Sequence, residues 1–137
     1  MTLALSFFSA LSAVTFSSHA AFAQMTSAPQ PVIEKGVLIV HAAGNSALNL
    51  DDPTVSNFPN KFTTDGNVIG NWIEVGASSA IKGPKLPATF SNYGTKSVDL
   101  FAPGVAIMST IIDNEYSSYS GTSMASPTAA GVAALVL

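Results

Sequence analysis

Short apolar runs separated by polar, turn-rich segments set the pattern of this chain from residue 37 onward. The runs "VLIVHAA" (37–43) and "NWIEVGAS" (71–78) are rich in branched residues, and the first is typical of a strand buried on both faces. A long polar loop is expected between them, over residues 46–70, and a turn-rich connection follows over 80–97. "VDLFAPG" (98–104) and "VAIMST" (105–110) are further strand-like runs, and residues 111–121 lead into a final helix.

Helical signals flank these strands. "VIEKG" (32–36) resembles the last turn of a helix, with Lys35 near the C-terminus and Gly36 at the left-handed C′ position. The final helix reaches Leu137 inside an apolar stretch, without a capping glycine. Apolar strands with a helix before the first and after the last predict an α/β fold with a mostly parallel sheet flanked by helices. We expect this body, residues 32–137, to be a partial domain truncated at both ends.

The first 23 residues differ from the rest. An apolar run ends in the small-x-small sequence Ala21-Phe22-Ala23, which predicts a secretory signal peptide cleaved after Ala23, although its start carries no Lys or Arg. A buried apolar helix or an unrelated leader is the alternative. A membrane anchor is not expected, because the run is shorter than the ~20 residues needed to span a bilayer and contains Ser and Thr. Residues 24–31 are predicted to be a linker, and the protein is predicted to be exported.

Composition narrows the function classes. Of the 137 residues, 47% are hydrophobic and only 9% charged, against about 25% in typical soluble domains, which suits part of a larger core. The net charge is −3, with five Lys and no Arg, so nothing favours a nucleic-acid partner. There is no Cys and therefore neither a disulfide nor a thiolate metal site.

The stretch "YSGTSMASP" (119–127) places Ser123 just before the final helix. A Ser in this position is usually an N-cap, worth about 1 kcal/mol, and Pro127 is compatible with a first turn. A nucleophile is the other interpretation, because a helix N-terminus offers partial positive charge where an oxyanion would form. Gly121 would allow close backbone approach there, and the small residues Ala125, Ala129, Ala130 and Gly131 would allow tight helix packing. The residues of this stretch alone leave both interpretations open.

Three blocks decide between them. "SGTSMASPTAAGVAAL", "VLIVHAAGNS" and "FSNYGTKSVDLFAPGVAIMST" resemble, in the right order, segments of the subtilisin-like serine proteases (the subtilases, family S8). The resemblance covers roughly residues 32–137 and implies a partial subtilisin-like three-layer fold. It makes Ser123 the nucleophile and Asn45 an oxyanion donor, with the Ser123 backbone N–H as the second donor. It also implies that Ala42, Ala43 and Gly44 line one wall of the substrate pocket.

The acid and the base of the family's triad are missing from the expected places. Both should precede Asn45, in D-[ST]-G and H-G-T contexts, and neither motif is present. The histidines are His19, inside the leader, and His41, which we expect to be a packed or hydrogen-bonded strand residue rather than a base. Asp51, Asp52 and Asp65 are predicted to form a solvated acidic loop rather than a calcium site. Asp99 is predicted to be structural, so no cofactor or metal is assigned.

The sequence therefore predicts part of an exported subtilisin-like endopeptidase acting on proteins or peptides. Without a base, Ser123 is a weak nucleophile, and the chain alone is expected to be inactive. The alternative is a non-enzyme, a catalytically inactive remnant or a binding protein. A third option is that a partner chain supplies the missing Asp and His.

Overall fold

The computed structural model describes residues 5–6, 37–63, 66–80, 83 and 86–136. The predicted helical turn over 32–36, the predicted linker, His19 and Asp65 lie outside the described residues. The described elements are β1 (Leu5–Ser6), β2 (Ile39–Ala42), β3 (Trp72–Ser78), β4 (Leu100–Pro103), β5 (Ile107–Thr110), the 3₁₀ turn η2 (Ile112–Asn114), β6 (Tyr116–Tyr119) and α3 (Thr122–Val136).

A four-stranded parallel sheet in the order β1-β2-β3-β4 forms the body. In its centre His41 of β2 lies opposite Glu74 of β3, and Ala77 of β3 lies opposite Ala102 of β4. The predicted α/β class with a parallel sheet is thereby confirmed. The two-residue β1 lies inside the segment predicted as a signal peptide and pairs with β2, Leu5 opposite Ile39.

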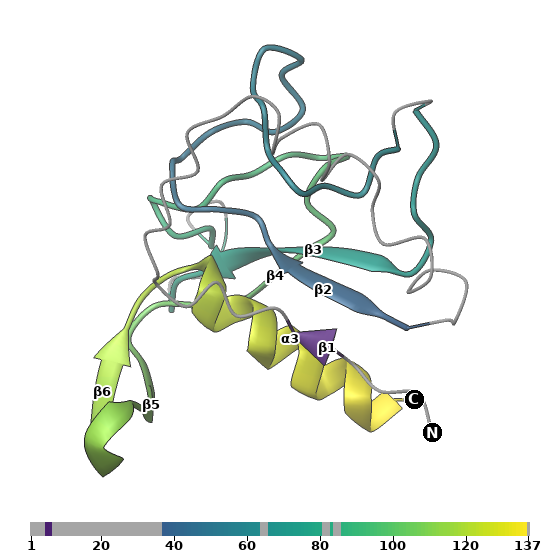
Figure 1. Cartoon of the computed structure of the whole chain (residues 1–137). Helices are drawn as coiled ribbons and strands as arrows, with labels where there is room; N and C mark the ends of the chain where they lie inside the picture. Colours follow the sequence, from purple (N-terminus) through teal and green to yellow (C-terminus); the bar gives the residue numbers. More distant parts are fainter. Residues whose placement is uncertain (1–4, 7–36, 64–65, 81–82, 84–85, 137) are drawn as a thin grey trace, which may run out of the picture.

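Helix α3 packs against one face of the sheet, as Figure 1 shows. Because side chains alternate along a strand, Val40 and Val75 point to this helix face, whereas their neighbours Ile39, His41 and Glu74 point to the other. The buried residues of the helix face are Val40, Val75, Ala77, Ala88, Ala102, Ala125 and Ala130. On the opposite face Ile39, Ile69 and Trp72 form a smaller apolar cluster beneath the long loops.

The details of α3 correct two expectations. Ala125 and Ala130 are buried as predicted, but Gly131 is exposed, and a Cβ there would meet no atom within 4 Å. Gly131 therefore does not serve close packing. Pro127 is the sixth residue of the helix, beyond the first turn in which we placed it. Its ring nitrogen cannot donate to the carbonyl of Ser123, so that carbonyl lacks its usual helical partner.

The segment 105–120 forms a separate antiparallel hairpin, which Figure 1 shows extending away from the sheet. The predicted strand 105–110 exists as β5, but it pairs with β6 and not with the parallel sheet. Strand β6 was not predicted, because its residues are polar and aromatic and leave no apolar run. Asp113 and Asn114 turn the chain at the tip, with φ of 64° and 59°.

The described residues of this range, 46–63 and 66–70, form the long loop that the sequence predicts, apart from isolated bridges such as Phe62 with Val68. No helix within the described residues has the length and apolar character required to cross a bilayer.

Candidate active site

Asn45 and Thr122 meet where β2 ends and α3 begins. The side-chain oxygen of Asn45 accepts hydrogen bonds from the Thr122 backbone N–H at 2.9 Å and from the Thr122 hydroxyl at 3.0 Å. An N–H can only donate, so the oxygen and not the nitrogen of the Asn45 amide must face the helix. Asn45 Nδ2 has no hydrogen-bond partner among the described residues and is therefore free to donate to another group.

Ser123 is the second residue of α3 and is half-buried. The Thr122 N–H at the start of the helix is capped from outside by Asn45, so the N-cap interpretation of Ser123 does not describe this helix. Within the described residues the Ser123 hydroxyl has no hydrogen-bond partner. Its backbone N–H belongs to the first turn, where no helical carbonyl is available to accept it. Ser123 thus presents a hydroxyl and an N–H at the positive end of the helix dipole.

The turn that carries Asn45 is tied to the helix a second time. The Gly44 N–H donates to the Thr122 hydroxyl at 3.1 Å, and that hydroxyl in turn donates a hydrogen bond to the side-chain oxygen of Asn45. The backbone of Gly121 donates to the carbonyl of Gly104, at 2.8 Å. A Cβ on Gly104 would lie 2.8 Å from the Gly121 carbonyl and 2.7 Å from Ala77 Cβ, so the loop after β4 reaches the helix start only because residue 104 is glycine.

The residues predicted to form a pocket wall lie at the end of β2. Ala43 is fully buried, whereas Ala42 and Gly44 are half-buried. Gly44 adopts a φ of +98°, which favours glycine, and a Cβ there would lie 2.6 Å from Asn92 Nδ2. Ala42 and Gly44 therefore keep exposed surface through which a substrate could be contacted, whereas Ala43 has none in this structure. The structure adds Asn92 as their buried neighbour.

His41 lies on the other side of the sheet from α3. Its Nδ1 is 2.9 Å from Glu74 Oε1, and its ring centroid is 5.3 Å from that of Trp72. Trp72 donates its indole N–H to Glu74 Oε2 at 2.8 Å. A histidine held on the face opposite the helix does not reach the Ser123 hydroxyl, so the expectation of a hydrogen-bonded structural His41 agrees with the structure.

Asp99 is structural, as predicted. Its carboxylate accepts from the Glu74 backbone N–H at 2.8 Å and pairs with Lys61 Nζ at 2.6 Å. The Lys61 side chain is buried. A buried ammonium needs such a partner, because burial without one is costly.

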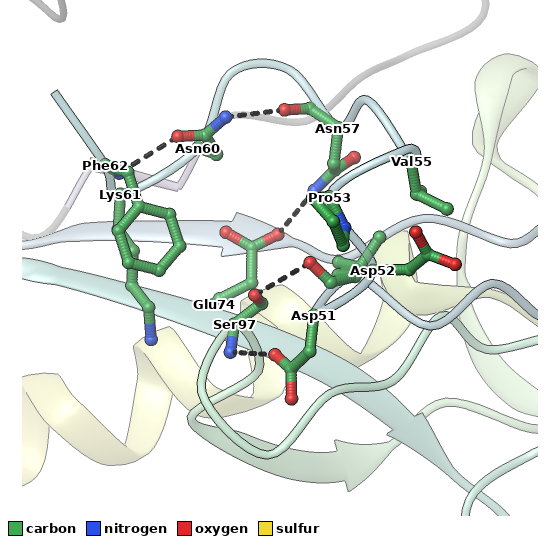
Figure 2. Close-up of a pocket in the computed structure, with 11 residues that line it drawn as sticks. Asp51, Asp52, Pro53, Val55, Asn57, Asn60, Lys61, Phe62, Glu74 and Ser97 are labelled. Atoms are coloured by element: carbon green, nitrogen blue, oxygen red, sulfur yellow. Dashed lines mark hydrogen bonds between the residues drawn. The ribbon is translucent and has the colours of Figure 1, made fainter. Parts of the chain in front are cut away.

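The acidic loop borders a cavity of about 160 Å³ on the same sheet face as Glu74 (Figure 2). Both carboxylate oxygens of Asp51 are already hydrogen-bonded within the protein. They accept from the backbone N–H groups of Thr95, Lys96 and Ser97 and from the Thr95 hydroxyl. Asp52 accepts from Thr54. The described residues hold no group of three or more His, Cys, Asp or Glu side chains arranged for a metal ion. This cavity does not include Ser123, and the candidate chemistry lies at the helix N-terminus instead.

Sequence reasoning missed Thr122 and Asn92 as parts of this site. Thr122 stands beside the nucleophile position and could have been suspected from that position alone. Asn92 lies in "FSNYG", 47 residues beyond Asn45, and nothing in its local pattern indicates contact with the end of β2.

Comparison with known proteins agrees with the geometry. The sequence model of the Subtilase family matches residues 11–137, and the match begins inside the predicted leader. The chain is 40% identical over 124 residues to alkaline elastase YaB of Bacillus sp. (strain YaB). These aligned residues cover 90% of this chain and 28% of the relative. It is 39% identical over 102 residues to subtilisin DY of Bacillus licheniformis, and this alignment covers 74% of this chain and 33% of the relative.

A solved structure is similar as well. The crystal structure of a cold adapted subtilisin-like serine proteinase superposes with a TM-score of 0.62 at 38% identity, covering 79% of this chain and 34% of that one. The chain thus spans about a third or less of the length of these relatives. The match along nearly all of its own length, together with the shared fold, shows that this chain belongs to the subtilase family of serine proteases.

Proposed function

We propose that this chain carries the nucleophile and the oxyanion donors of a subtilisin-like serine endopeptidase. The observation that supports this most directly is the orientation of Asn45. Thr122 fixes its side-chain oxygen, which leaves Nδ2 as a free donor beside the residue that precedes Ser123.

In this function the Ser123 hydroxyl attacks the carbonyl carbon of a peptide bond while a base accepts its proton. The carbonyl oxygen gains negative charge, and Asn45 Nδ2 and the Ser123 backbone N–H donate to it. The intermediate then expels the amine, which takes up the proton, and leaves an acyl group on Ser123 for water to remove. Loss of one such donor costs about 2.7–4 kcal/mol of transition-state stabilisation, a value that itself comes from a subtilisin.

The base is the missing element. Among the described residues the histidine is His41, and it is engaged with Glu74 on the sheet face opposite α3. A serine hydroxyl without a positioned base is a poor nucleophile at neutral pH. We therefore propose that this chain alone does not turn over peptides, and that an Asp and a His from further polypeptide are needed for activity.

The same observation favours a second candidate function. A chain with a complete oxyanion corner and no base would bind an extended peptide without cleaving it, as a catalytically inactive remnant or binding protein. In either case the partners we expect are proteins or peptides. We expect no nucleic-acid partner and, after cleavage of the signal peptide, no membrane anchor, and we assign no residue to a cofactor. The predicted signal peptide, residues 1–23, supports export as part of the proposal.

The test is peptide hydrolysis by the full chain and by Ser123→Ala. We expect no difference between them. Activity that disappears in Ser123→Ala would contradict the proposed lack of a base. Co-expression with a polypeptide carrying the D-[ST]-G and H-G-T motifs, followed by labelling with a fluorophosphonate, tests whether Ser123 becomes reactive. Absence of labelling in that complex, with peptide binding retained, would favour the binding protein.

A further inference from the structure

Asn92 sits behind the turn that carries Asn45 and is hydrogen-bonded to it on both sides. Its Nδ2 donates to the Ala43 carbonyl at 2.7 Å, and its backbone N–H donates to the Gly44 carbonyl at 2.9 Å. Its Oδ1 accepts from the backbone N–H groups of Ser46 and Leu48, both at 3.0 Å. The side chain therefore fixes the backbone before and after Asn45 without touching Asn45 itself.

Asn92 is buried, so water cannot replace the hydrogen bonds of its side-chain amide. Its relative exposure is 5%, so each polar atom of its amide must be satisfied within the protein. The Oδ1 atom accepts two bonds and Nδ2 donates one, in the space that a Cβ on Gly44 would occupy. A glycine at position 44 and an amide at position 92 are thus matched to each other.

By fixing the turn 43–48, Asn92 also affects the position of Asn45 next to the nucleophile position, Ser123. The oxygen of Asn45 can meet the Thr122 N–H and hydroxyl only if the turn 43–48 holds its present course. That contact in turn orients the free Nδ2 of Asn45. We infer that Asn92 is the positioning residue of the oxyanion corner: it sets where Asn45 lies relative to the start of α3. The inference rests on the proposed role of Asn45 as an oxyanion donor.

The experiment is amide hydrogen exchange by NMR on the full chain, which does not require peptidase activity. In Asn92→Ala we expect the exchange of the Ser46 and Leu48 amides to rise about fivefold or more, the factor that loss of one net hydrogen bond corresponds to. We also expect faster exchange of Thr122 and an upfield shift of its amide proton. Among the described residues no hydrogen bond joins Asn92 to Thr122, so a purely local role of Asn92 would leave the Thr122 signal unchanged.

Two further variants make the result specific. Ser91→Ala removes a buried hydroxyl that accepts from the Ala77 N–H and donates to the Asn92 backbone carbonyl, but it leaves the Asn92 side-chain amide in place. It should therefore alter Ala77 and leave Ser46 and Thr122 unchanged. Asn92→Asp keeps an acceptor for Ser46 and Leu48 but loses the donor to the Ala43 carbonyl. The Ser46 and Leu48 amides should therefore exchange more slowly than in Asn92→Ala.

The inference is overturned if Asn92→Ala leaves Ser46, Leu48 and Thr122 unchanged, or if their exchange rises no more than that of Val75 in β3. If Asn92→Ala does not fold, Asn92→Asp decides, because it breaks the bond to the Ala43 carbonyl: faster exchange of Thr122 with Val75 still protected supports the inference, and an unchanged Thr122 amide overturns it. A failure to cleave peptides would leave these amide signals as they are, so the two proposals fail separately.

Discussion

His41 and Glu74 face each other across neighbouring parallel strands, with the imidazole Nδ1 2.9 Å from a carboxylate oxygen. Glu74 is only 1% exposed, and its oxygens also accept from the Trp72 indole and, at 3.3 Å, from Asn57 Nδ2. A buried carboxylate is tolerated only when donors of this kind surround it. Loss of His41 would therefore leave this buried carboxylate short of a donor on the sheet face away from the helix.

Replacing His41 tests this structural role. In His41→Ala the carboxylate loses its strongest donor on Oε1, and the free energy of unfolding should fall by about 1–3 kcal/mol. Urea unfolding can be followed by the fluorescence of Trp72, the single tryptophan of the chain. His41→Gln keeps a side-chain N–H that can donate to Glu74, so its free energy of unfolding should fall less than that of His41→Ala. Equal stability of His41→Ala and the parent chain would contradict the assignment.

Asn45 has two separable functions. Asn45→Ala removes the acceptor for Thr122 and should cost about 0.5–2 kcal/mol, as loss of an N-cap does. Asn45→Asp keeps the acceptor and adds negative charge at the helix N-terminus, so stability should be retained. Both variants lack the Nδ2 donor, and in a complex that cleaves peptides both should lower kcat about 10²- to 10³-fold. Thermal unfolding and kcat, measured on the same preparations, check the separation, which a stability loss in Asn45→Asp would contradict.

Asp51 should make stability sensitive to acid. The hydroxyl of Thr95 first, and then the backbone N–H groups of Thr95 and Ser97, hold the pKa of Asp51 well below its usual range, against an opposing effect of desolvation. A carboxyl whose pKa is lowered by folding contributes stability above its unfolded pKa, about 3.9, and this contribution is lost as the pH falls further.

The variant Asp51→Asn cannot titrate. It should be less stable than the parent chain at pH 7, and the difference should narrow below about pH 4. Urea midpoints measured between pH 7 and pH 2.5 give the comparison. Asp113→Asn, at the exposed hairpin tip, is the matched control. A difference that stays constant with pH would show that Asp51 does not act through its charge.

Two glycines should respond oppositely to the same substitution. Gly104→Ala places a methyl group 2.7 Å from Ala77 Cβ and 2.8 Å from the Gly121 carbonyl, and should cost about 1–3 kcal/mol. Gly131→Ala meets no atom within 4 Å inside a helix and should add about 0.5–1 kcal/mol. Chemical denaturation gives both values. Destabilisation by Gly131→Ala would mean that its face of α3 is covered.

The fold could be predicted where burial leaves a continuous apolar run. Strands β2 and β3 follow such runs, and α3 follows a row of small apolar residues. Strand β4 also follows an apolar run, although of its four residues only Ala102 is buried. Strand β6 could not be predicted, because a two-stranded ribbon that lies outside the core does not need an apolar pattern. Its residues, "YSSY", are mostly exposed and have no core-facing row to mark them.

The site was accessible from sequence only through the resemblance. Ser123 and Asn45 stand in local patterns that ordinary caps and turns share, and their order along the chain gave them meaning. Asn92 and Thr122 act through contacts made after folding, 44 to 78 residues away along the chain. Neither the local hydrophobic periodicity nor the local composition of the sequence indicates contacts between residues so far apart.

The link between Asn45 and Thr122 closes a chain loop of 77 residues. Closing a flexible loop of that length costs about 4 kcal/mol of chain entropy before any local contact compensates for it. The corner cannot therefore form early from neighbouring residues, as a hairpin does. It forms when α3 docks on the sheet, so the Thr122 amide should be among the last to gain protection during refolding.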